Sequence, residues 1–229
     1  MKTLPTKTIL CVLLACDLLF LLLHSAYADH SQIGTLIDLG GEGNLPTWYS
    51  SFKFTLAAIA ALACGYDSAQ RSPRENNFSV YGWFAVAVLM LAMSADETGQ
   101  VHETATRWIM QSEGGQNLRD YFGVSEAGGA LLWVVLLSPL LLGIGGALCI
   151  FYYLQFRSTP HLFKWAVVMT ALFVFAAVLE TVQAKLFGSA IDAQSLSRYK
   201  TLSNIEEMSE LAGSSLLVWI HISFFKERQ

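Results

Sequence analysis

Charged residues are scarce in this sequence. They make up 14% of the 229 residues, while 54% are hydrophobic, and soluble domains carry about 25% charged residues. The shortage excludes an ordinary soluble domain and indicates an integral membrane protein whose main partner is the lipid bilayer. A net charge of -4, without any basic run, argues against a nucleic-acid partner.

The sequence also lacks the common catalytic and metal-binding motifs. It contains no GxSxG, Walker A, HExxH or dinucleotide-binding pattern, so no such chemistry is predicted and an enzymatic function stays open. The four cysteines form no CxxC or Cys/His ligand spacing, and we expect them to be small buried hydrophobic residues. They are Cys11, Cys16, Cys64 and Cys149.

Long apolar segments dominate what is present. Each holds about the 20 residues needed to cross a bilayer, and only helices or closed barrels can span lipid. The runs are too long and continuous for barrel strands. We therefore predict an all-α fold, a single transmembrane domain over residues 1–229 built as a bundle of about six helices. The predicted spans are residues 8–28, 49–66, 80–110, 129–156, 161–187 and 204–225.

The first span has a second interpretation. Residues 1–28 form either a retained signal-anchor helix or a cleaved signal peptide, because Ala26–Ala28 resembles a signal-peptidase site. Asp17 and His24 interrupt the apolar run, which is also long for a signal peptide. These features favour retention.

The positively charged residues predict the orientation. With six spans, most of them fall on one side, which indicates a multi-pass protein of the bacterial inner membrane with both termini in the cytoplasm. The residues on that side are Lys2, Lys7, Arg71, Arg74, Arg157, Lys164, Lys226 and Arg228.

Acidic residues gather near the predicted outer face. The stretch SADETGQVHE follows an unbroken apolar run, and Asp96 lies 16 residues after Val80, about 24 Å up its helix. Glu180 reaches a similar height on the fifth predicted helix. The sixth helix begins on the outer side with Glu206 and its acidic neighbours. Three separate helices are therefore expected to bring acids into one outer layer.

Helical periodicity places several of these residues on common faces. Asp96, Gln100 and Glu103 are predicted to share one stripe of the third helix, and Glu206 and Glu210 share a stripe of the sixth. Ionised acids at membrane depth are costly and face the bundle interior or a cavity. They need a metal ion, protonation or nearby cations to offset their repulsion.

Three interpretations of these acids stay open. The acids could end helices that emerge into water, where the helix dipole favours them, or they could form a proton or cation relay. Our first hypothesis is a metal site, perhaps redox-active, at the outer face. An oxygen-rich set of ligands with one histidine suits iron or manganese, and a dinuclear site is conceivable, although the Glu-x-x-His motif of di-iron bundles is missing. The candidate ligands are Asp96, Glu97, His102, Glu103, Glu180, Glu206, Glu207 and Glu210.

A different class of function is also compatible with the sequence. The protein could be a non-catalytic accessory subunit of a larger membrane complex, in which case other membrane-protein subunits would be its partners and the acids would make structural contacts.

Four motifs occur in a fixed order along most of the chain: EGNLPTWYSS, SADETGQVHE, LETV and NIEEMSELAGSSL. This set resembles a family of small multi-pass bacterial membrane proteins. The pattern of that family is DE, HE, a single intramembrane Glu and EExxE, and here it falls on the eight candidate ligands named above. The resemblance implies a membrane protein and no particular activity.

Overall fold

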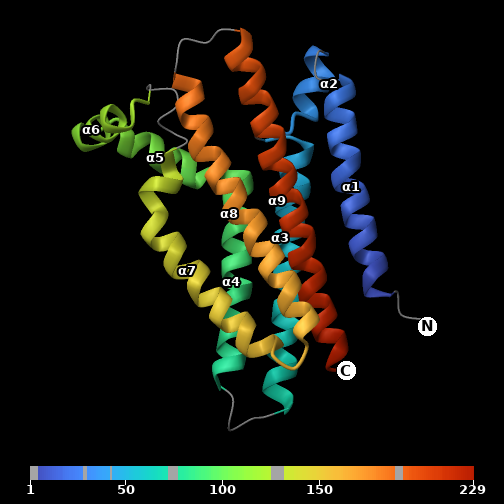
Figure 1. Cartoon of the computed structure of the whole chain (residues 1–229). Helices are drawn as coiled ribbons and strands as arrows, with labels where there is room; N and C mark the ends of the chain where they lie inside the picture. Colours follow the sequence, from blue (N-terminus) through green and yellow to red (C-terminus); the bar gives the residue numbers. More distant parts are fainter. Residues whose placement is uncertain (1–4, 28–29, 42, 72–76, 125–131, 189–192) are drawn as a thin grey trace.

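The computed structural model describes residues 5–27, 30–41, 43–71, 77–124, 132–188 and 193–229. Within these ranges the chain is helical, with no strand, which confirms the predicted all-α class. Figure 1 shows long helices running side by side, with short helices lying across them near one end. The helices are α1 (Thr6–Tyr27), α2 (Ser31–Leu36), α3 (Leu45–Arg71), α4 (Asn77–Gly99), α5 (Val101–Met110), α6 (Glu113–Phe122), α7 (Trp133–Phe156), α8 (Pro160–Gly188) and α9 (Ala193–Glu227).

Five of these helices, α1, α4, α7, α8 and α9, are long and apolar enough to cross a membrane. The protein is therefore a multi-pass membrane protein. The remaining predicted span corresponds to α3, which has 27 residues but is less apolar because it carries Lys53, Asp67 and Arg71. It packs against α4 and α9 and lies within the bundle (Figure 1).

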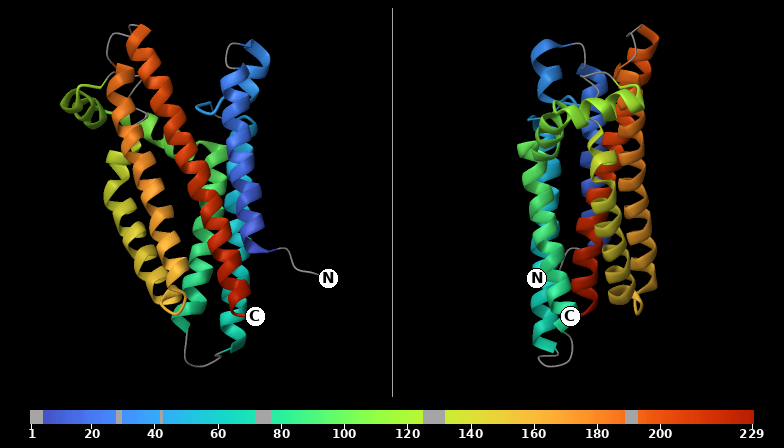
Figure 2. Two further views of the ribbon diagram at one scale, coloured as in Figure 1. Left: turned by 45° about the vertical axis from the view of Figure 1, so that its right-hand side comes forward. Right: turned by 90° about the vertical axis from the view of Figure 1, so that its left-hand side faces the viewer.

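Helix α9 lies at the centre of the bundle. In the apolar 18-residue stretch of α9, 72% is buried inside the protein. The corresponding share is 6% for α1 and for α7. It packs against α1, α3 and α8, and the turned views show these helices around it (Figure 2). The apolar surfaces of α1 and α7 are left to face lipid.

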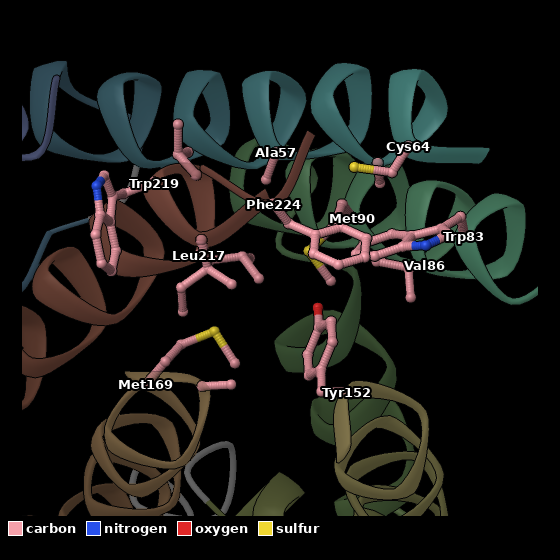
Figure 3. Packing of buried hydrophobic residues seen from close by; sticks show 14 of the residues in the cluster. Ala57, Cys64, Trp83, Val86, Met90, Tyr152, Met169, Leu217, Trp219 and Phe224 are labelled. Carbon is pink, nitrogen blue, oxygen red and sulfur yellow. The ribbon is translucent and has the colours of Figure 1, made fainter. Parts of the chain in front are cut away.

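Aromatic and small side chains fill the main core (Figure 3). The indole of Trp83 on α4 packs edge-on against the rings of Phe151 and His221 and stacks on Phe224. On α3 the core residues include fully buried alanines such as Ala57, which let its backbone approach α9 closely.

The predicted third span, residues 80–110, is not one helix. It ends as α4 at Gly99, and α5 starts at Val101 in a different direction (Figure 1). Gln100 between them has φ 50° and ψ 40°, in the left-handed region that ends a helix. The stripe predicted for Asp96, Gln100 and Glu103 is therefore wrong, because the residues no longer share one helix axis.

A second, smaller core joins the short helices to the bundle. Met110, Val124, Leu132 and Ala184 are buried there together. Ser112 caps α6 by accepting a hydrogen bond from the Gly115 amide, and the turn between α5 and α6 is tight. Helices α5 and α6 are thus fixed to the ends of α7 and α8.

The cysteines differ from their expected burial. Cys64 is buried, but Cys11 and Cys149 are exposed on the outside of the bundle, so the expectation that all four cysteines are buried is wrong. They lie on α1 and α7, the helices with the least buried surface. The cleavage interpretation of residues 1–28 is not tested, and Ala28 lies outside the described residues.

Candidate functional site

A histidine–carboxylate pair closes the corner between α4 and α5. The backbone N–H of His102 donates to Asp96 Oδ1 at 2.9 Å, and Nδ1 of the same ring lies 2.6 Å from Asp96 Oδ2. The side chain of His102 is 24% exposed and that of Asp96 is 35% exposed. Asp96 therefore both stabilises the start of α5 and holds His102 at the surface of the bundle.

A tryptophan connects this pair to a buried glutamate. The rings of His102 and Trp133 are 4.5 Å apart, and the indole N–H of Trp133 donates to Glu180 Oε1 at 2.5 Å. Glu180 is buried on α8, as is Glu206 on α9. The carboxylate of Glu206 accepts a hydrogen bond from the side-chain amide of Gln183, one turn after Glu180. Each buried acid thus has a donor, as buried polar groups require.

Glu97 faces the interior from α4. Its carboxylate accepts a hydrogen bond from Ser50 Oγ on α3 at 2.9 Å. It lies within electrostatic range of Glu210 on α9 and of Asp96 and His102 beside it. Glu97 therefore lies between the partly exposed pair and the centre of the bundle.

Electrostatic interactions link these acids one to the next. Glu180 interacts with Glu206, Glu210 and Glu103, while Glu210 interacts with Glu97. These interactions join acids on different helices, but they do not establish the predicted carboxylate cluster, which stays a prediction.

The two remaining candidates lie at the margin of this group. Glu103 pairs with Arg107 at 3.4 Å on the partly exposed side of α5. Glu207 interacts electrostatically with Tyr199.

A buried ion pair lies deeper in the bundle. Lys53 Nζ on α3 donates to Asp17 Oδ1 on α1 at 2.9 Å, and Ser215 Oγ on α9 donates to Asp17 Oδ2 at 2.7 Å. Lys53 also donates to the carbonyl of Leu211 at 2.7 Å and lies within electrostatic range of Glu97. Both charged side chains are almost fully buried. Asp17 was recognisable as a charge that interrupts an apolar run, but the sequence did not identify Lys53 as its partner.

A second buried polar group lies farther along α9. The Nε2 atom of His221 is 2.8 Å from the hydroxyl of Tyr152, and its Nδ1 atom is 3.0 Å from the carbonyl oxygen of Ala57. Ala57 follows Lys53 by one helical turn of α3. This group was not predicted, because a single histidine in an apolar helix carries no pattern.

The eight predicted ligands do not assemble into a metal centre. Among the described residues, no three His, Cys, Asp or Glu side chains are placed so that they could hold one metal ion. Non-haem iron of the facial-triad type needs three such side chains at one point. The iron or manganese site thus stays a prediction without support in this geometry, and the same holds for a partner subunit.

Neither the curated proteins nor the solved structures gave a match to this chain. The family model described as "Domain of unknown function (DUF8692)" matches residues 8–224. The matched region includes α1 except its first two residues, the ion pair of Asp17 with Lys53 and all eight candidate ligands. The resemblance to one family along most of the sequence is thereby confirmed, and the chain belongs to the DUF8692 family.

Proposed function

We propose that the protein moves protons across the membrane, with α9 as the central element of the route. The observation that carries this proposal is the series of ionisable side chains from the surface pair His102–Asp96 to the buried pair Lys53–Asp17. His102–Asp96 and Lys53–Asp17 are ion pairs, and Glu97 lies within electrostatic range of both. Ionisable residues within a membrane commonly mark such routes.

The spacing of the groups favours protons over metal cations. A metal ion needs several ligands at one point, whereas a proton needs only one acceptor at a time. The described acids interact one after another across neighbouring helices, but no three of them form a group that could hold a metal ion. This arrangement suits transfer from one acceptor to the next.

We place the entrance at the corner between α4 and α5. The His102–Asp96 pair is accessible there, and Glu97 lies within its electrostatic range. Glu97 in turn interacts with Lys53, whose ammonium group contacts Asp17. A second branch begins at Glu206 and Glu180 and joins at Glu210.

An apolar layer separates this route from the other side. On α9 the side chains between Ser215, which donates to Asp17, and His221 are apolar and buried, Leu217 among them. We infer that transfer across this layer, towards His221 and Tyr152, is the slowest step. A barrier of this kind would prevent uncontrolled leakage of protons.

The proposal includes the finer topology expected from the sequence. All six long helices, α3 included, cross the bacterial inner membrane, and both termini lie in the cytoplasm. The corner between α4 and α5 then faces the outer water. The uncovered apolar surfaces of α1 and α7 support contact with lipid on these helices.

The test is proton flux into liposomes that contain the purified protein and a pH-sensitive dye, driven by an imposed membrane potential. We expect wild-type protein to conduct, and Glu97→Gln to reduce the flux about a hundredfold, the usual contribution of a positioned acid–base group. Ser50→Ala removes the donor to Glu97 and is expected to have an intermediate effect.

Glu113→Gln is the matched control. Glu113 is an exposed acid in the first turn of α6, outside the series of interacting groups, so its flux should equal that of wild type. Circular dichroism checks that each variant keeps its helix content. Wild-type flux no greater than that of empty liposomes would refute the proposal, as would equal flux in the Glu97 and Glu113 variants.

A further inference from the structure

Helix α5 has three distinct faces. His102, Thr106 and Met110, at four-residue spacing, point towards the bundle, and the last two are buried. Val101, Ala105 and Trp108 form an exposed apolar stripe, in which the side chains of Val101 and Trp108 are 59% and 72% exposed.

The charged residues of α5 lie away from that stripe. Glu103 and Arg107 form an i,i+4 ion pair, which at about 100° per residue is roughly opposite the stripe. One exposed side of the helix is therefore apolar and the other is charged. This division is typical of a helix that lies in the boundary between lipid and water.

The position of α5 agrees with such a boundary. It lies crosswise to the bundle where α4 ends and α7 begins, in all views (Figures 1 and 2). Both neighbours present apolar surface to lipid, as Val88 on α4 and Leu142 on α7 illustrate. The apolar stripe of α5 is thus close to two lipid-facing helices at the level where they end.

We propose that the stripe of Val101, Ala105 and Trp108 is a membrane-binding surface, embedded at the headgroup boundary of the leaflet nearest α5. The occupant is lipid: the glycerol and upper acyl-chain region contacts the apolar stripe, and the headgroups meet Glu103 and Arg107. Tryptophan is enriched at this depth because its ring is amphipathic. The inference does not depend on proton transfer.

This placement has a consequence for the neighbouring histidine. His102 adjoins the stripe in sequence and points towards the bundle from the same helix. A helix held at the boundary fixes the depth of the His102–Asp96 pair, so the entrance to the polar interior lies at the membrane surface.

The depth of Trp108 can be measured by fluorescence quenching. Wild type and Trp108→Phe are reconstituted in vesicles of lipids brominated either near the headgroup or deep in the acyl chains, and the difference between their emissions isolates Trp108. We expect most of this emission to be lost with bromine near the headgroup and little with deep bromine or with iodide on both sides of the membrane.

Trp83→Phe provides the matched control, because the Trp83 side chain is fully buried and its difference emission should resist all three quenchers. Strong quenching of Trp108 by iodide without quenching by bromine would overturn the inference. Stronger quenching by deep bromine, or none by any quencher, would overturn it as well.

Discussion

Asp17 is the only buried residue of α1, and it is held by Lys53 and Ser215. Transferring two charges out of water is costly, and the attraction between them only partly repays that cost. Removing one partner leaves the other buried and unsatisfied. The pair therefore fixes the position at which α1 attaches, even where it adds little net stability.

We predict that Lys53→Met or Asp17→Leu alone lowers the free energy of unfolding by about 3–5 kcal/mol, the usual loss when one member of a buried ion pair is removed. The double variant should return close to wild type, because an apolar pair leaves no buried charge. Thermal unfolding in detergent, followed by circular dichroism, measures the effect. The explanation would be contradicted if the double variant unfolded as easily as the less stable of the two single variants.

At this scale the sequence was informative about residue type and less so about partners. The eight acidic and histidine candidates were recognisable because charge is rare in apolar segments. Whether Lys53 pairs with Asp17 or with the acids near α5 depends on how α3 is rotated about its axis. The spacing of residues along α3 does not reveal this rotation. His221 and Tyr152 meet across 69 residues of sequence separation and have no local signal.

Among the elements, the connection between α5 and α6 leaves no room for a larger residue at Gly115. A Cβ atom at Gly115 would lie 2.3 Å from the carbonyl oxygen of Ile109 and 2.4 Å from the Cα of Met110. These are backbone atoms, which cannot move without displacing α5. The adjacent Gly114 has nothing closer than the Ser112 hydroxyl at 4.0 Å.

We therefore predict that Gly115→Ala separates α5 from α6 and loosens the small core around Met110. Overpacking of this kind costs about 1–3 kcal/mol or more. Limited proteolysis should cut between the two helices faster in this variant than in wild type. Gly114→Ala, the same change one residue earlier, should leave the cleavage rate unchanged, and equal rates for both variants would argue against the clash.

Helix α4 illustrates why elements were easier to predict than their ends. Its apolar composition predicted a span, but the predicted helix was carried through residues 101–110, so the turn at Gln100 was missed. No proline marks the turn, and the Asp96 side chain that supports it lies four residues earlier in sequence. Such a turn is stabilised by side-chain hydrogen bonds that composition does not reveal.

On the scale of the whole molecule, the proposed orientation places α6 and the turn between α7 and α8 on opposite sides of the membrane. Asn117 and Arg157 are exposed there, and each can be replaced by cysteine. We predict that a membrane-impermeant maleimide labels Asn117→Cys in intact spheroplasts, and Arg157→Cys only after permeabilisation. Wild type provides the background from the native cysteines, and the reverse pattern would invert the topology.

The overall class was predictable because membrane solvation restricts the possible folds so strongly. The identity of the central helix was not. Of the five spans, α9 has the lowest mean hydropathy, 1.3, against 2.4 for α1 and α7. In a soluble protein the most apolar elements are buried, but here lipid accepts them and the polar helix must be covered by protein.

The position of α9 also bears on how the protein is made. It follows every other described helix in the chain, so α1, α3, α4, α7 and α8 leave the ribosome before the helix that they surround. Until α9 arrives, Asp17 lacks Ser215, and Lys53 lacks the carbonyl of Leu211. The bundle can therefore close around α9 only after that helix has been made.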